Sequence, residues 1–442
     1  MANSDILKLS NDGKTVIGVN DMSVKSITIP DGVTGIGDGA FACCSSLQSI
    51  NVSKDNKHFA SVDGILFNKD LTAIVRFPQK NDVKEYVIPT SVTEIRNSAF
   101  SGCSSLQSID IPDSVTEIGD SAFSDCSSLQ SIDIPDSVTK IGDGAFKNCS
   151  SLQSIDIPNS VTVIGNNAFK CCSSLQSIDV SNDNMHFASV DGILFNKDLT
   201  AIVRFPPKYD VNEYVIPNSV TVIGYGTFEG CSSLQRIDIP NCVTEIGDSA
   251  FWDCSFLQSI TIPDGITIIG NEVFMGCKSL QRIDIPDSVT KIGDRAFSHC
   301  RSLQNIDVSK DNKHFASVDG ILFNKDLTAI VRFPPKYEVK EYIIPNSVTK
   351  IMWHAFHGCS SLQSIDIPNS VTEIGPWAFH GCNSLEHIYL HCNDVEKLEV
   401  DAVIFYGVNF DKCILHIPSG TRWAYRHHDV FKRFKNIVTT GF

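Results

Sequence analysis

The stretch LQSIDIPDSVTEIGDSAFSDC, residues 106–126, contains one complete unit of a repeat. In it, the alternation of Ile109 and Ile111 predicts a β-strand with one face turned inward, and Pro112 ends that strand because proline cannot donate to a continuing ladder. The first leucine recurs at a constant spacing, at Leu106, Leu129, Leu152 and Leu175. A single coil cannot bury its apolar face alone, so the stacking of neighbouring coils must create the core.

The spacing of these leucines, about 23 residues, lies in the range of leucine-rich repeats, in which a strand and a short return segment make each coil. We therefore predict a leucine-rich repeat solenoid, mainly β, built as one curved array. Ala122 and Phe123 would pack in a short helical or 3₁₀ turn of the return segment. Residues 1–24 read as an N-terminal cap and residues 25–390 as the solenoid. Residues 391–442 read as the C-terminal cap, because the period breaks there.

The sequence also has a second, longer period of 128 residues. The segment HFASVDGILFNKDLTAIVRFP occurs unchanged at 58–78, 186–206 and 314–334, and it lengthens the step from Leu47 to the next leucine of this kind, Leu106. The resulting inserts lie near 53–82, 181–210 and 309–338. Two apolar runs flank the polar turn at residues 68–70, which is a β-hairpin pattern. We predict three enlarged coils, each with a hairpin that projects from the solenoid in the same conformation.

Charge and hydropathy exclude several classes of function. The chain of 442 residues has a formal net charge of −15, which argues against nucleic acid and against anionic membranes. No apolar run approaches the roughly 18–20 residues that span a bilayer. The N-terminus lacks a basic region followed by an apolar run. Two predictions stay open: a cytoplasmic protein, or a surface or secreted protein whose export signal has been removed.

Two core ladders follow from the repeat. Phenylalanine recurs at a fixed distance from other core positions, which predicts a buried spine rather than an aromatic binding stripe. Equivalent Cys side chains stack in parallel and rarely present a disulfide torsion, so we predict buried, reduced thiols. Cys43 and Cys171 stand beside this ladder and should be more exposed. Eleven of the 16 Cys share the ladder position: Cys44, Cys103, Cys126, Cys149, Cys172, Cys231, Cys254, Cys277, Cys300, Cys359 and Cys382.

The outward positions of the strands are the candidate binding residues, and we expect them to face the concave side of the sheet. One reading is an acidic stripe for a basic partner or for divalent cations; the other is a solvated face screened by salt. In later coils, Arg, His and Tyr replace Ser or Asp. The candidates are Asp110, Asp133, Asp156, Asp179, Arg236, Asp238, Arg282, Asp284, Asp307, Asp366, His387 and Tyr389.

The basic and aromatic stretch RWAYRHHDVFKRFK, residues 422–435, predicts a cap helix over the last coil, with a docking surface for an acidic partner as the alternative. No nucleophile with a base, phosphate-cradling glycines or paired carboxylates form a unique constellation. We therefore predict no enzymatic activity, no cofactor and no metal site.

The repeat IPDSVTEIGDSAFSDCSSLQSI, the insert SVDGILFNKDLTAIVRFP and the ending CILHIPSGTRWAYRHHDVFKRFKNIV together resemble the BspA-like (Treponema-type) leucine-rich repeat family of Bacteroidetes. The resemblance implies a leucine-rich repeat solenoid and association with bacterial adhesion to host matrix proteins. We accordingly predict a non-enzymatic protein-binding scaffold, with a surface adhesin as its specific form. The alternative is an intracellular or structural protein that assembles with copies of itself.

Overall fold

A computed structural model describes residues 6–441. The chain divides into two compact units. Unit 1 runs to Asp210 and adds Phe228–Gly230, and unit 2 comprises Val211–Thr227 and Cys231–Phe442. Both are built from stacked β-coils with almost no helix, as the repeat period predicts.

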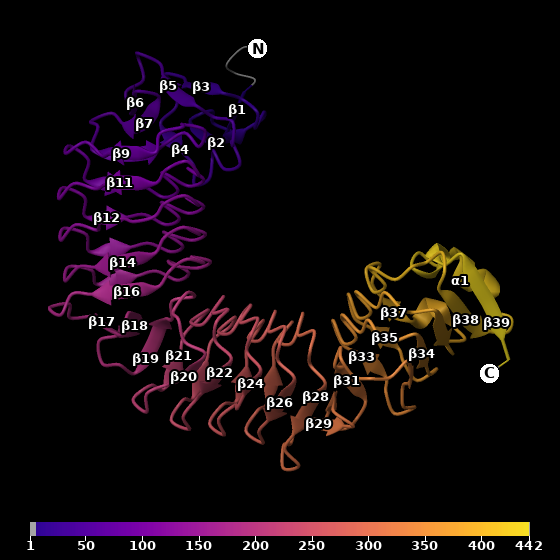
Figure 1. Cartoon of the computed structure of the whole chain (residues 1–442). Coiled ribbons are helices and arrows are strands. Elements are labelled where there is room, and N and C mark those ends of the chain that lie inside the picture. Colours follow the sequence, from indigo (N-terminus) through magenta and orange to yellow (C-terminus); the bar gives the residue numbers. More distant parts are fainter. Residues whose placement is uncertain (1–5, 442) are drawn as a thin grey trace. The chain divides into compact units, whose positions relative to one another are not determined.

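In unit 1, most coils contribute to two parallel ladders, which appear as successive rungs in Figure 1. The first ladder uses the predicted I-x-I strands. It pairs β3 (Ser26–Ile29) with β5 (Ser49–Val52), β9 (Glu85–Val87) with β11 (Ser108–Asp110), and β14 (Ser154–Ile157) with β16 (Ser177–Val180). The second ladder consists of β8 (Ala73–Arg76), β10 (Glu94–Ile95), β12 (Glu117–Ile118), β13 (Lys140–Ile141) and β15 (Val163–Ile164).

The second ladder was not predicted. Ile118 is buried and Glu117 is exposed, so two residues suffice to alternate across a pleat. Gly119 follows because the coils are close here: a Cβ at Gly119 would lie 2.7 Å from the carbonyl carbon of Arg96. Conversely, the first ladder is less continuous than the repeat suggests, because no strand forms at residues 131–135. The expectation of an I-x-I strand in every coil is wrong at that coil.

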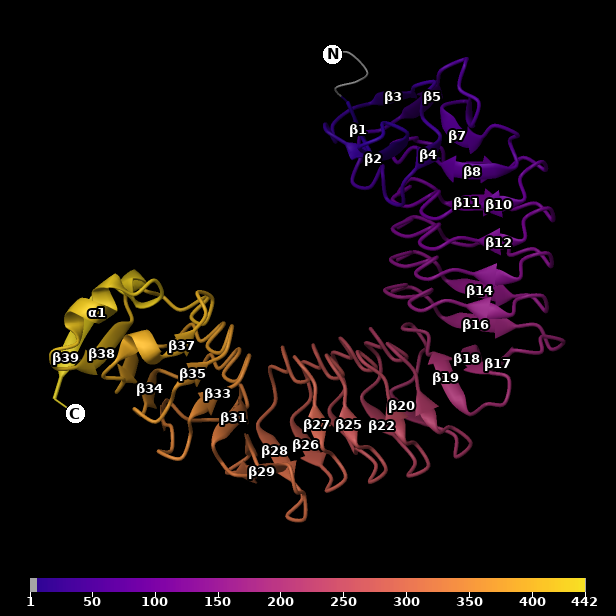
Figure 2. The same cartoon turned by 180° about the vertical axis from the view of Figure 1, so that it is seen from behind.

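Unit 2 has the same two ladders (Figure 2). The strands of the first are β20 (Glu213–Val215), β22 (Arg236–Asp238), β24 (Ser259–Ile260), β26 (Arg282–Ile285), β28 (Asn305–Val308), β32 (Glu341–Ile343), β34 (Ser364–Ile367), β36 (His387–Leu390), β38 (Ile414–Pro418) and β39 (Asn436–Thr440). Those of the second are β21 (Val222–Ile223), β23 (Glu245–Ile246), β25 (Ile268–Ile269), β27 (Lys291–Ile292), β31 (Ala329–Arg332), β33 (Lys350–Ile351), β35 (Glu373–Ile374) and β37 (Glu399–Val400). Both ladders continue past residue 390, into the segment predicted as the cap.

Each insert forms a three-stranded antiparallel meander. The first contains β6 (Phe59–Val62), β7 (Ile65–Asn68) and β8; the second contains β17 (Phe187–Val190), β18 (Ile193–Asn196) and β19 (Ala201–Arg204); the third contains β29 (Phe315–Val318), β30 (Ile321–Asn324) and β31. The three copies have the same register, which confirms the predicted hairpin and its repetition. The prediction that it projects is wrong, because Ile65, Leu66 and Phe67 are buried and β8 joins the second ladder.

Stacked side chains fill the core. Phe123 lies between Phe100 and Phe146, with ring centroids 5.1 and 5.5 Å apart and nearly parallel planes. All eleven ladder cysteines are buried and free, as predicted. The thiol of Cys149 donates to the carbonyl oxygen of Phe123 at 3.1 Å, so the sulfur also satisfies a backbone group of the preceding coil.

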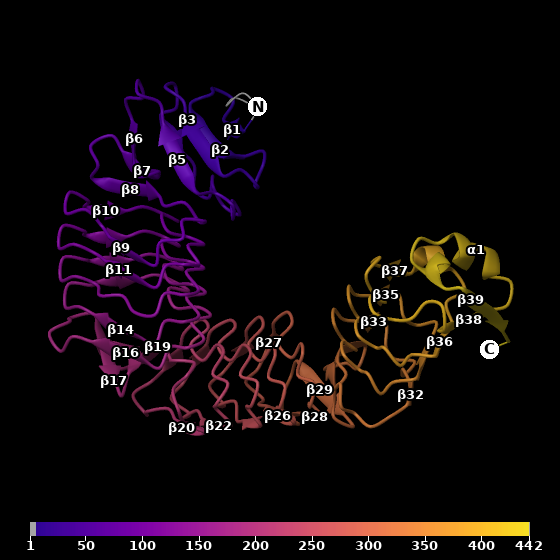
Figure 3. The ribbon, with the colours of Figure 1, turned by 45° about the horizontal axis from the view of Figure 1, so that its top comes forward.

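Helix is confined to the C-terminal end of the described chain: η2 (Val395–Lys397), α1 (Arg422–His427) and η3 (Phe431–Arg433). Figure 3 shows α1 beside β38 and β39, and its buried Tyr425 donates to the carbonyl oxygen of Cys392 at 2.8 Å. The helical turns predicted in the coils are instead simple turns. Ser121 and Asp125 have φ angles of 54° and 62°, and left-handed residues on both sides of Ala122 and Phe123 prevent a helix from propagating.

The N-terminal end is closed by a hairpin. β1 (Leu7–Leu9) pairs antiparallel with β2 (Thr15–Val19), and β2 in turn pairs parallel with β4 (Gly35–Ile36). The buried Leu7 and Val16 pack against the first coil, so the cap covers apolar surface that has no preceding coil to bury it.

Candidate functional site

The predicted outward aspartates of unit 1 lie on one face. Asp110, Asp133, Asp156 and Asp179 are exposed while the isoleucines beside them are buried. In the pair β14–β16, Asp156 stands directly opposite Asp179. Within residues 6–441, no side-chain hydrogen bond or ion pair is formed by either carboxylate. Like charges in register repel, so this pair has a local electrostatic cost that the described chain does not offset.

A shallow hollow of about 360 Å³ opens at this pair. Asp136, Asp156 and Asp179 line it together with Pro158 and Ser181. We call these five residues the acidic hollow. Its position follows from the sequence, because Asp156 and Asp179 occupy the same outward position of consecutive repeats, and Asp136 follows Pro135 of the preceding repeat.

In unit 2 the corresponding pair of aspartates has its own cation. Asp284 stands opposite Asp307, and Arg282 Nε lies 3.1 Å from Asp284 and 3.0 Å from Asp307. The hydrogen bond with Asp284 raises the pKa of Arg282 above its ordinary value. Arg236 also forms an ion pair with an acid on the neighbouring strand, since its Nη1 lies 3.6 Å from Glu213. Asp238, two residues after Arg236, is exposed.

The last predicted candidates come together at the C-terminal end of the same ladder. Asp366, Tyr389 and His416 occupy one register line across β34, β36 and β38. Asp366 pairs with His391 at 2.8 Å, and the rings of Tyr389 and His416 stack with centroids 4.2 Å apart. His387 Nδ1 lies 3.0 Å from His416 Nε2. Burial lowers the pKa of His416, and the neighbouring His387 lowers it further.

The sequence interpretation missed three apolar residues on this face. Val87, Val215 and Ile343 are 68%, 68% and 74% exposed. In register, they stand opposite Asp110, Asp238 and Asp366 respectively. The signal was present in the motif E-Y-[V/I]-I-P after each insert, where a branched apolar residue replaces the outward aspartate of S-I-D-I-P.

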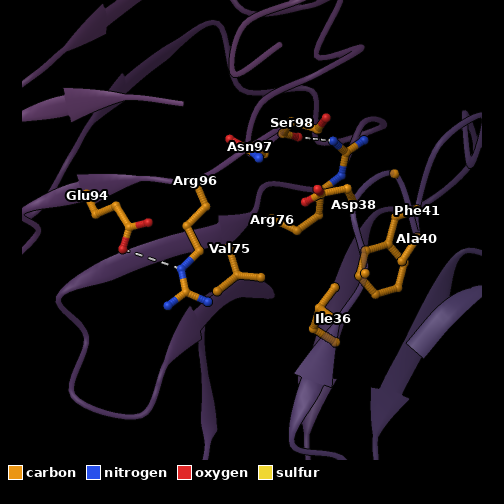
Figure 4. A pocket seen from close by; sticks show the side chains of 12 residues that line it. Ile36, Asp38, Ala40, Phe41, Val75, Arg76, Glu94, Arg96, Asn97 and Ser98 are labelled. Atoms are coloured by element: carbon orange, nitrogen blue, oxygen red, sulfur yellow. Dashed lines mark hydrogen bonds and ion pairs between the residues drawn. The ribbon is translucent and has the colours of Figure 1, made fainter. Parts of the chain in front are cut away.

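A second missed feature is the arginine at the end of each insert. Arg76, Arg204 and Arg332 are all buried. Figure 4 shows Arg76 reaching Ser98 beside a cavity of about 200 Å³, and its other terminal nitrogen donates to the carbonyl oxygen of Ser101 at 2.8 Å. Burial lowers the pKa of Arg76 and of Arg332. We call the space around each arginine an insert crevice.

The thiols of the buried cysteine ladder are unreactive. Burial raises the pKa of Cys103 to about 12 and that of Cys126 well above its ordinary value, so these thiols are not nucleophiles at neutral pH. Residues 6–441 contain no group of three or more His, Cys, Asp or Glu placed to hold a metal ion. Nor does any helix in that range have the length and apolar character to cross a membrane.

The BspA-type leucine-rich repeat region matches residues 19–80, 75–191, 205–324 and 332–416. The chain belongs to this family. Proteins of the family are typically bacterial surface proteins and non-enzymatic scaffolds whose repeats mediate protein interactions.

Solved structures support the fold. A leucine-rich cell surface protein from Faecalibacterium prausnitzii has 27% identity and a TM-score of 0.52, over 89% of this chain and 96% of its own. The pneumococcal vaccine antigen PcpA has 20% identity and a TM-score of 0.51, over 98% and 82%. A leucine-rich repeat protein from Eubacterium ventriosum has 22% identity and a TM-score of 0.50, over 78% and 89%. None of the curated proteins compared with the chain matches it.

Proposed function

We propose that this chain is a bacterial surface adhesin that binds a host matrix protein through the aspartate-bearing face of its first ladder. The observation that carries the proposal is the in-register pair Asp156 and Asp179, which has no cation of its own within the described chain. The family is typically found at bacterial surfaces, and the cell surface protein of Faecalibacterium prausnitzii has the same fold.

Unit 2 shows what a partner's cation would do at the acidic hollow. There, Nε of one guanidinium lies within 3.1 Å of both Asp284 and Asp307, so a single cation reaches two carboxylates at once. A Lys or Arg side chain of the partner would occupy the equivalent place between Asp156 and Asp179. The exposed Val87 adds apolar surface on the same face of unit 1. Binding of this kind weakens as salt rises, because exposed charges are screened.

The test compares two variants with equal loss of charge. Asp156→Asn/Asp179→Asn removes the pair in the acidic hollow, while Asp113→Asn/Glu117→Gln removes two acids of unit 1 that lie outside the hollow. Each is measured by surface plasmon resonance against purified host matrix proteins at 50, 150 and 500 mM salt. We expect the first variant to bind at least tenfold more weakly, with a flatter salt dependence, and the second to bind as wild type. Equal binding by both variants would place the contact elsewhere.

Self-assembly is the second candidate, and the C-terminal segment favours it. Arg426 is exposed and Trp423 is 74% exposed, with Arg422 beside them on the same short helix, so α1 presents a basic, aromatic surface that complements the acidic hollow of another copy. Sedimentation velocity across a hundredfold range of protein concentration, at low and high salt, tests it. Salt-sensitive oligomers that Arg422→Ser/Arg426→Ser abolishes would support assembly, and a monomer throughout would exclude it.

A further inference from the structure

A cavity of about 530 Å³ lies beside the insert crevice of unit 2. It is separate from the smaller cavity of about 70 Å³ that Arg332 itself lines. His299, His357 and His380 line the larger cavity together with Arg301 and Lys336, and the remaining lining residues are uncharged. A pocket of this size suits a small ligand. Among the described residues, its lining has cations and hydrogen-bond donors but no carboxylate, so its electrostatic character is the opposite of that of the acidic ladder.

The buried Arg332 lies behind this wall. Its two terminal nitrogens donate to the carbonyl oxygens of His354 and His357 at 2.5 and 3.0 Å, and its Nε has no hydrogen-bond partner in the described chain. Burial lowers the pKa of Arg332, and within residues 6–441 no ion pair joins its guanidinium to a carboxylate. A buried charge without a counter-ion is costly, and an anion held against His357, whose carbonyl oxygen accepts from Arg332, would reduce that cost.

The crevice of the second insert has a different residue at the position of His357. Its sequence is identical, but the position equivalent to His357 in the coil that follows it is Glu229. Glu229 is 2% exposed and brings a buried carboxylate into the crevice of Arg204, where it lies 3.9 Å from Lys170 and accepts a hydrogen bond from the thiol of Cys171 at 3.2 Å. The third insert has a histidine and a cavity in place of that carboxylate.

His357 is the best-placed donor for an incoming anion. It is 4% exposed, its ring centroid lies 4.5 Å from that of His299 and 4.8 Å from that of His380, and its Nδ1 has no hydrogen-bond partner within residues 6–441. An unpaired polar atom at such burial is uncommon in a folded protein, and it leaves this nitrogen available to a ligand in the cavity.

We propose that this cavity binds a small anion that carries a phosphate, sulfate or carboxylate group, with His357 and the rim cations Arg301 and Lys336 as its donors. The site is independent of the aspartate-bearing face, so it stands whether or not the adhesin proposal holds.

His357 would meet an incoming anion as a neutral hydrogen-bond donor. Burial first, and after it the nearby Arg332, His299, His354 and His380, lower the pKa of His357 to about 2. The charged groups that act on His299 are Arg301, Arg332 and Lys278, and no acid of the described chain is among them. His357 is therefore neutral at pH 5.5 and at pH 7.5, and it contributes a ring N–H rather than a positive charge to a bound anion.

The experiment is calorimetric titration of the full chain with inorganic phosphate, sulfate and citrate at pH 5.5 and pH 7.5. The key variant is His357→Glu, which matches the residue of the second insert and supplies the missing carboxylate. A second variant, Arg301→Gln/Lys336→Gln, removes the rim charges, and Lys291→Gln is the control at an exposed cation outside the cavity.

We expect wild type and Lys291→Gln to bind at least one of the three anions at both pH values. Both His357→Glu and the rim variant should bind at least tenfold more weakly, with unchanged circular dichroism. If His357→Glu does not fold, the rim variant decides alone. No binding of any of the three anions at either pH, or binding that the foldable variants leave unchanged, would overturn the proposal.

Discussion

Replacing one aspartate of the acidic hollow should stabilise unit 1, whereas the same replacement in unit 2 should not. Neighbouring strands are about 4.8 Å apart, and two unit charges at about 5 Å in water repel by about 0.8 kcal/mol. Asp179→Asn removes that repulsion from Asp156, which has no cation in the described chain to offset it. Asp307→Asn removes the equivalent repulsion from Asp284, but it also removes one of the two carboxylates that Arg282 contacts.

Hydrogen exchange measured on peptides of β14–β16 and of β26–β28 separates the two effects. A gain of about 0.8 kcal/mol slows the exchange of amides in β14–β16 about fourfold where local opening limits exchange, and Asp307→Asn should leave β26–β28 unchanged or faster. At 1 M salt, with a Debye length of about 3 Å, most of the gain should vanish. Equal slowing in both variants, or slowing that persists at 1 M salt, would show that in-register repulsion is not its cause.

Three further predictions concern the core. Thiol labelling of the native protein at pH 8 should modify the exposed Cys43 first and Cys171 slowly, because burial raises the pKa of Cys171 to about 11; rapid labelling of most of the 16 thiols would contradict this. Phe123→Ala should lower the free energy of unfolding by about 3–5 kcal/mol, measured by urea denaturation, because the ring is fully buried between two others. His357 stays neutral in the folded state while an unfolded histidine protonates below about pH 6.5. Unit 2 should therefore be most stable above that pH and lose up to about 2 kcal/mol by pH 5, seen as a fall in the tryptophan-fluorescence midpoint that His357→Gln suppresses.

The period alone predicted the coil, its I-x-I strand and its buried ladders, because apolar residues at fixed spacing have only one way to be buried. It did not predict the second ladder, since a two-residue strand such as Glu117–Ile118 has too little alternation to recognise. The turns around Ala122 were predicted as helical because propensity does not reveal that Ser121 and Asp125 are left-handed. The buried meander was predicted to project because polar turn residues suggest exposure.

The sequence placed the outward aspartates correctly on one face but could not rank them. The difference between Asp179 and Asp307 depends on whether a cation lies within reach, and Arg282 supplies it only in unit 2. Strand spacing and register decide that contact. The exposed Val87 could have been predicted from the sequence, since the motif E-Y-V-I-P has valine at the position where S-I-D-I-P has the outward aspartate.

The insert crevices were hidden for a different reason. A repeat pattern is recognised by the residues that stay constant. The unchanged insert was therefore easy to identify, whereas the variable residues of the coils that flank it were not. Because the three inserts have the same sequence and the same strand register, they place the same arginine in the same buried position. The differences among the crevices therefore come from the flanking coils, above all from the position occupied by Ser101, Glu229 and His357 in turn. Each arginine donates to the backbone carbonyl oxygen at this position, so the buried cation keeps the same contact in all three crevices while the side chain beside it changes from a hydroxyl to a carboxylate to an imidazole.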